Sequence, residues 1–77
     1  MSANITLKYP TESGLKELNL RRPKVRDMIA AEKAKGGDAD REINLFANLA
    51  ECTPEDIASL DMADYKQLQE AYQSFLS

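Results

Sequence analysis

The spacing of apolar residues changes once along this chain, at Pro23. Before this proline, apolar and polar residues alternate in two short runs, separated by a break that contains proline and glycine. A period of two is typical of a strand with one buried face, and the break predicts a turn. We therefore expect an antiparallel β-hairpin in residues 1–20, with one face covered by helices. The alternating apolar positions are Ile5, Leu7, Tyr9, Leu18 and Leu20.

Residues 23–76 show helical spacing instead. Pro23 is predicted to be the first residue of a helix, because the N–H that proline lacks has no partner there. Gly36-Gly37 is predicted to end this helix. Between them, three apolar residues form a short stripe at helical spacing. These residues are Val25, Met28 and Ile29.

Further helix starts follow along the chain. Residues 43–50 are apolar on more than one face, which predicts the central, most buried helix. Thr53-Pro54 has the pattern of a capped helix start, and Asp61 can cap a last helix. That last helix carries most of its apolar residues on one side, namely Tyr65, Leu68, Tyr72, Phe75 and Leu76. The sequence predicts one α+β domain, residues 1–77: a two-stranded antiparallel β-hairpin (1–20) followed by three or four short α-helices (23–76).

The composition argues against catalysis. The chain has 77 residues, no histidine and a single cysteine, Cys52. A histidine base near neutral pH, a Cys–His or Ser–His nucleophile and an intrachain disulfide are therefore excluded. No glycine-rich phosphate loop is present, and the carboxylates are explained by helix capping and solubility. We expect no enzyme, no cofactor and no metal site, and we interpret Cys52 as a packed thiol.

Charge is divided unevenly along the chain. Residues 1–35 carry a balance of +4 and residues 36–77 a balance of −7, which sum to the net charge of −3. Such asymmetry indicates either interaction surfaces of opposite sign or two halves that face each other. The acidic total argues against nucleic acid as the main partner. No apolar run reaches the roughly 20 residues that span a bilayer, so we expect no membrane contact and a cytoplasmic location.

Two groups of residues are candidates for binding a partner. Arg21, Arg22 and Arg26, with Lys24, surround a helix start, where cations are unfavourable and an anionic partner would relieve them. Tyr72, Phe75 and Leu76 lie near the end of the last helix and could face a partner. The alternative interpretations are a solvated helix end for the cations and ordinary core packing for the apolar residues.

The order and spacing of these features resemble a known family, the short tail assembly chaperones of contractile-tailed (Mu-like and related) bacteriophages and prophages. The most specific piece is the Arg-Pro pair at residues 22–23 with Asp27 four residues beyond the proline. The loop before Leu15 varies in length in the family. The resemblance extends over nearly the whole chain and is carried by residues 5–10, 18–27, 44–49, 53–57, 60–65, 68–72 and 75–76.

The resemblance implies a non-enzymatic role. Chaperones of this family hold the long, largely helical tape measure protein soluble before the tail tube polymerises around it. They leave before the tail is complete, so the chain is expected in the host cytoplasm and not in the virion. The family also implies a longer form made by a programmed translational frameshift. This longer form and further copies of the chain are the other expected partners.

Two alternatives remain open at the level of sequence. The first is a small phage or prophage regulator that binds nucleic acid through the basic helix start. The second is a structural tail adaptor that stays in the finished particle. The net charge argues against the regulator, whereas composition does not separate an adaptor from a chaperone.

Overall fold

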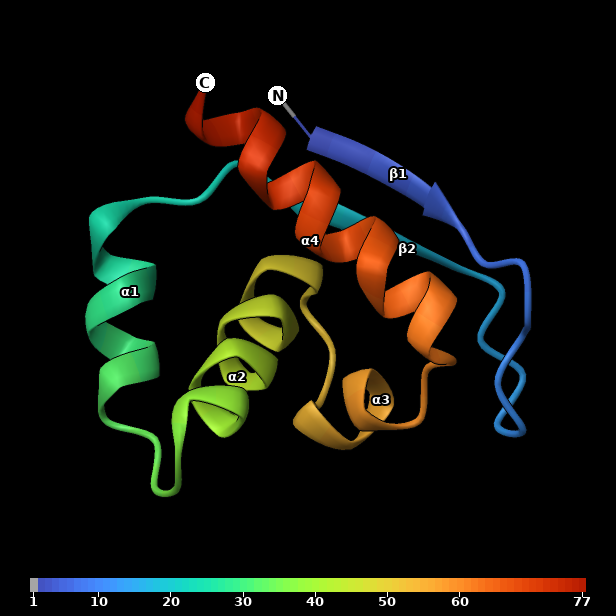
Figure 1. Ribbon diagram of the computed structural model, residues 1–77, viewed down its shortest axis with the longest axis horizontal. Coiled ribbons are helices and arrows are strands. Elements are labelled where there is room, and N and C mark those ends of the chain that lie inside the picture. The colour runs from blue at the N-terminus through green and yellow to red at the C-terminus, as the bar shows by residue number, and fades with distance from the viewer. Residues whose placement is uncertain (1) are drawn as a thin grey trace.

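The computed structural model describes residues 2–77 and shows two strands followed by four helices (Figure 1). The α+β arrangement predicted from the sequence, with the hairpin first, is confirmed. The elements are β1 (Ser2–Thr6), β2 (Glu17–Arg21), α1 (Val25–Glu32), α2 (Asp38–Ala50), α3 (Pro54–Ala58) and α4 (Met62–Leu76).

The hairpin buries one face, as the alternation predicts. β1 and β2 are antiparallel, with Ile5 opposite Leu18 and Ala3 opposite Leu20. Because residues two apart in a strand point to the same side, these pairs share one face of the sheet. Ile5, Leu18 and Leu20 are all buried in the core. The hairpin therefore supplies one wall of the hydrophobic core.

The strand alternation does not continue to Tyr9, so this part of the prediction is wrong. β1 ends before Leu7, which is still buried. The backbone N–H groups of Lys8 and Tyr9 instead donate to the carboxylate of Asp64 in α4, at 2.9 and 3.0 Å. This contact fixes the chain in a path outside the strand, and the Tyr9 side chain is 57% exposed.

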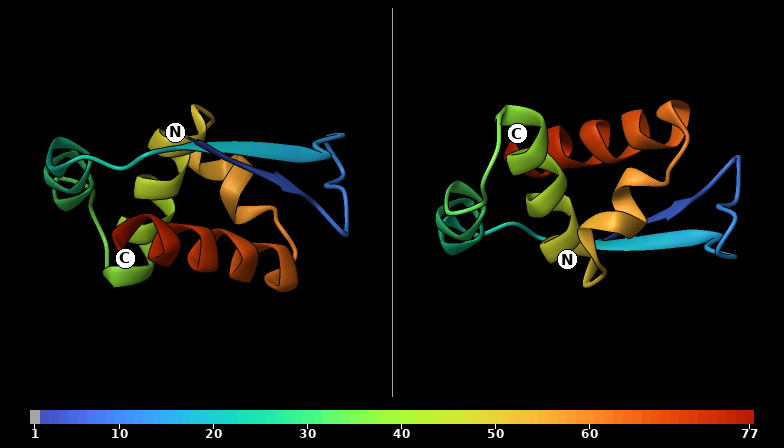
Figure 2. Two further views of the ribbon diagram at one scale, coloured as in Figure 1. Left: turned by 90° about the horizontal axis from the view of Figure 1, so that it is seen from above. Right: turned by 90° about the horizontal axis from the view of Figure 1, so that it is seen from below.

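Helix α2 is the central helix, as predicted. Phe46 and Leu49 are completely or almost completely buried, and the Phe46 ring packs against the Tyr65 and Tyr72 rings. The ring centroids lie 5.6 and 5.8 Å apart, in the T-shaped geometry that aromatic pairs favour. Figure 2 shows the hairpin and α4 in two layers, with α2 running from one layer to the other, and α4 contacts β1. Helix α1 stands at one end, beside α2 and away from the hairpin.

The bounds of α1 differ from the prediction at both ends. The helix begins at Val25, two residues after Pro23, because the Asp27 carboxylate accepts the N–H of Lys24 at 2.8 Å and makes Lys24 the N-cap. It ends at Glu32, before the glycine pair. Gly37 is the N-cap of α2, and its N–H donates to the Asp40 carboxylate at 3.2 Å.

The starts of α3 and α4 agree with the sequence pattern. The Thr53 hydroxyl accepts the N–H of Asp56, and the Asp56 carboxylate accepts the N–H of Thr53. Asp61 caps α4 by accepting the N–H of Ala63 at 2.9 Å. Among residues 2–77, no helix combines the length and apolar character that a membrane crossing requires.

Candidate partner-binding site

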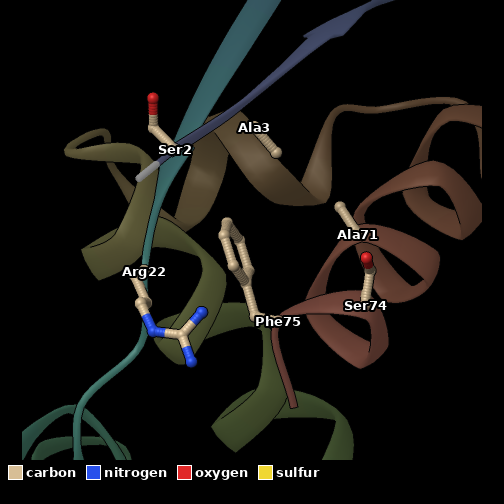
Figure 3. A pocket seen from close by; sticks show the side chains of 6 residues that line it. All are labelled: Ser2, Ala3, Arg22, Ala71, Ser74 and Phe75. Carbon is tan, nitrogen blue, oxygen red and sulfur yellow. The ribbon is translucent and has the colours of Figure 1, made fainter. Parts of the chain in front are cut away.

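The end of α4 borders a pocket of about 260 Å³ beside the start of the hairpin (Figure 3). The Phe75 ring stands in it, between the guanidinium of Arg22 and the side chain of Ala3. Arg22 Cζ lies 6.0 Å from the centre of this ring, within the range of a cation–π contact. Ser2, Ala71 and Ser74 complete the lining. Arg22 and Phe75, both singled out in the sequence, therefore meet in one site.

A second pocket, of about 220 Å³, lies between the end of α4 and the start of α1. Its lining is mostly apolar, with a single cation. Both pockets use the Arg22-Pro23 segment and the last two turns of α4, and we refer to them together as the α4 groove. The residues of the second pocket are Pro23, Lys24, Val25, Met28, Tyr72 and Leu76.

Three large apolar side chains that line the α4 groove are exposed to solvent. Val25 is 70% exposed, Met28 55% and Leu76 58%. Isolated exposed apolar residues are ordinary on protein surfaces, whereas neighbouring ones that line a hollow indicate a binding site. These three side chains line one pocket although they come from two helices at opposite ends of the helical region.

Cations border this apolar surface. Arg22 and Lys24 line the groove itself, and Arg26 lies exposed in the first turn of α1. Within residues 2–77, no acidic side chain forms an ion pair with any of these three. The positive end of the α1 dipole adds to their charge. The border of the groove is therefore suited to a negatively charged group on a partner.

Arg21 is used inside the chain. Its guanidinium donates to both carboxylate oxygens of Asp27, at 2.7 and 2.9 Å, and joins the end of β2 to the first turn of α1. These hydrogen bonds lower the pKa of Asp27 to about 2, against the opposing effect of burial, and the N–H of Lys24 lowers it further. The pair fixes α1 and Lys24 beside the groove.

The structure thus brings together four of the six predicted binding residues: Arg22, Tyr72, Phe75 and Leu76. Arg21 contacts Asp27, and Arg26 does not line either pocket. The predicted roles of all six residues in binding stay predictions. Sequence reasoning placed Lys24 in the basic group but did not include Val25 or Met28 among the binding residues. The signal for Val25 and Met28 was present, because their stripe follows the basic segment directly.

The single cysteine of the chain, Cys52, lines neither pocket of the α4 groove. Burial raises the pKa of the half-buried Cys52 thiol, and the charge of Asp56 raises it further, so this thiol is protonated at neutral pH. Within residues 2–77, no three His, Cys, Asp or Glu side chains come close enough together to hold a metal ion. The α4 groove, in contrast, presents exposed apolar side chains bordered by cations.

Comparison with known proteins identifies the family. Residues 4–77 match the family described as "phage tail assembly chaperone proteins, E, or 41 or 14", which is nearly the whole chain. Searches of the curated proteins and of the solved structures found no significant match. Because the match covers all but the first three residues of the chain, this chain belongs to the phage tail assembly chaperone family.

Proposed function

We propose that this chain binds the tape measure protein of a phage tail and keeps it soluble until the tail tube polymerises. The observation that carries this proposal is the convergence of Tyr72, Phe75 and Leu76 with the exposed apolar residues of α1 in the α4 groove. A long, largely helical protein exposes apolar helix faces that aggregate until they are covered. A groove between two helices can receive such a face.

The charges beside the groove favour an acidic partner segment. Arg22, Lys24 and Arg26 border the groove and have no acidic partner within residues 2–77. We propose that the bound segment is an amphipathic helix with acidic residues beside its apolar face. Complementary charges of this kind speed association and fix orientation more than they add affinity. The proposed role is non-enzymatic and belongs to the host cytoplasm, with release before the tail is complete.

Co-expression tests this proposal. The chain, with an affinity tag, is produced together with the tape measure protein of the same phage, and the soluble fraction is sized and analysed by pull-down. We expect a soluble complex, and an insoluble tape measure protein when the chain is omitted. If the tape measure protein stays insoluble and uncaptured, both with this chain and with any longer frameshifted form, the proposal is wrong.

A second measurement addresses release. We expect the chain to be absent from purified virions of the same phage, by mass spectrometry. Its presence at a fixed ratio to the tail proteins would show that the chain stays in the particle as a structural adaptor.

A further inference from the structure

The second pocket of the α4 groove has walls from two helices that hardly touch each other. Val25 and Met28 come from α1, and Tyr72 and Leu76 come from α4. Among the six elements in residues 2–77, α1 makes extensive contact with α2 alone. Figure 1 shows α1 at one end of the molecule, joined to the rest through α2. The width of this pocket therefore depends on how α1 is placed against α2.

Helix α1 buries little apolar surface. Within its eight residues, Ala31 is the only apolar one that is buried, whereas Val25, Met28 and Ile29 are each more than half exposed. Alanine has a single methyl group, so its burial stabilises a helix far less than burial of a leucine does. Helices this short are marginal on their own in water. Elements with few buried apolar contacts open locally more readily than the core does.

The two ends of α1 are held unequally. At its start, the guanidinium of Arg21 and the N–H of Lys24 donate to the Asp27 carboxylate in three hydrogen bonds of 2.7–2.9 Å. At its end, Nε of Arg41 lies 3.9 Å from the Glu32 carboxylate and has no hydrogen-bond partner within residues 2–77. Both of these side chains are partly exposed, and such ion pairs contribute little to stability. The start of α1 is therefore a fixed point, and its end is loosely held.

The segment that follows α1 is suited to a hinge. It runs from residue 33 to residue 37 and ends in two adjacent glycines. Gly36 has a φ of +108°, a conformation that residues with a side chain rarely adopt. Hinges are a few residues at the ends of elements that absorb a change in backbone angles. A rotation of α1 about its start can be absorbed at Gly36 and Gly37 without moving α2.

We propose that α1 is a movable wall of the α4 groove. It pivots about the Arg21–Asp27 pair, so that its end leaves α2 and Met28 moves away from Leu76. A helical segment enters the widened groove, and α1 then closes on its apolar face. Contacts of this segment with Val25 and Met28 stabilise the closed position, because only that position offers them. This loading mechanism rests on the proposed function for the identity of the bound segment.

Amide hydrogen exchange of the free, full chain tests the movement of α1. Exchange is followed by NMR at low urea concentrations and corrected for the intrinsic rate of each residue. We expect the amides of Ala30 and Ala31 to exchange about a hundredfold faster than those of Phe46 and Leu49 in α2. Their rates should hardly change with urea, because opening of α1 alone exposes little surface. Equal rates and equal urea dependence in the two helices would overturn the proposal, since α1 would then open only when the whole chain unfolds.

Two glycine variants separate the contact with α2 from the intrinsic stability of α1. Ala31 is buried and Ala30 is exposed in the same turn, so Ala31→Gly and Ala30→Gly weaken the helix alike. Only Ala31→Gly also removes a buried methyl group, and exchange in α1 should be about fourfold faster in this variant than in Ala30→Gly. Equal exchange in the two variants would contradict a wall that is held closed by its contact with α2.

The complex with the co-expressed tape measure protein separates this proposal from the proposed function. We expect exchange in α1, measured by mass spectrometry, to slow about tenfold or more in the complex, because the bound segment holds the wall closed. A captured tape measure protein that leaves exchange in α1 unchanged would overturn the movable wall and leave the proposed function intact. If no complex forms, the proposed function fails, and the measurements on the free chain alone decide whether α1 moves.

Discussion

The guanidinium of Arg21 holds both carboxylate oxygens of Asp27, with Nη2 to Oδ1 at 2.7 Å and Nη1 to Oδ2 at 2.9 Å. The same carboxylate accepts the N–H of Lys24 at 2.8 Å. A single buried acid therefore caps α1 and ties it to the hairpin. It also places one border of the α4 groove, because Lys24 and Val25 follow directly from the position of this cap.

We predict that Asp27→Asn destabilises the chain by about 1–2 kcal/mol, because Arg21 and Lys24 lose a charged acceptor. This loss of stability is smaller than for a fully buried ion pair, because the Arg21 side chain is 37% exposed and solvent screens its charge. Asp40→Asn is the matched control, because Asp40 has the same place in the first turn of α2 but is exposed. Its cost should be about 0.5 kcal/mol or less. Urea denaturation measures both, and equal effects would contradict the prediction.

The dependence of stability on pH follows from the same pair. The pKa of Asp27 falls from 3.8 to about 2 in the folded chain, chiefly through the hydrogen bonds from Arg21. Because the folded pKa is below the unfolded one, the stabilisation is complete above about pH 5 and is lost as the pH falls from about 4 to 2. The difference in unfolding free energy between wild type and Asp27→Asn should therefore shrink across this interval. A difference that stays constant from pH 6 to pH 2 would contradict this assignment.

A second buried carboxylate, Asp64, should control the loop after β1. Burial raises its pKa, but hydrogen bonds from the N–H groups of Lys8 and Tyr9 and from Gln67 outweigh this effect and hold the pKa below its usual value. Asp64→Asn replaces an oxygen acceptor by a donor, so one N–H of the loop loses its partner. We predict a lower urea midpoint and at least tenfold faster amide hydrogen exchange at Lys8 and Tyr9.

The control for Asp64 comes from the same helix. Asp61 caps α4 from an exposed position, and asparagine is an equally good capping residue. Asp61→Asn should therefore leave both the urea midpoint and the amide exchange of the loop unchanged. Exchange at Lys8 and Tyr9 that is no faster in Asp64→Asn than in Asp61→Asn would contradict the assigned role of Asp64.

Sequence predicts the local parts of this structure well and the long-range contacts poorly. The cap at Thr53 and Asp56 was predictable, because both partners lie within one turn of a helix. Asp64 gave no such signal, since the two N–H groups it binds belong to residues 55 and 56 positions earlier. Arg21 lies in a strand and Asp27 in a helix. The spacing of apolar residues predicts each element but not a contact between their polar side chains.

The candidate site was also predictable in its local features and not in its long-range contacts. Sequence spacing indicated the apolar stripe of α1 and the aromatic side of α4, and both exist. Whether a stripe is buried depends on which element covers it, and this is decided by the whole fold. Helix α4 covers Phe46 through Tyr65 and Tyr72, whereas no element covers Met28. The sequence therefore indicated the apolar surfaces without showing which of them stay open.

Charge at the groove should affect capture of the tape measure protein. Arg22 lies over the Phe75 ring and lines the groove, whereas Arg26 is exposed and lines neither pocket. We predict that Arg22→Glu lowers the affinity for the tape measure segment about tenfold or more, and that Arg26→Glu lowers it less. Lys66→Glu, on an exposed position of α4 outside the groove, is the control. Pull-down at 0.1 M salt measures the three variants, and unchanged binding of Arg22→Glu would remove Arg22 from the site.

Leu76 offers the sharpest test of the apolar contact in the groove. Its side chain is 58% exposed, so Leu76→Asp changes the surface without opening a cavity in the core. Burial of a leucine side chain contributes about 1.5–3 kcal/mol, so the variant should lose roughly tenfold to a hundredfold in affinity for the tape measure segment. Tyr9→Asp is the matched control, because Tyr9 is 57% exposed on the far hairpin loop. Circular dichroism should show both variants folded. If Leu76→Asp keeps the tape measure protein soluble as well as Tyr9→Asp does, the partner binds elsewhere and the α4 groove is not the site.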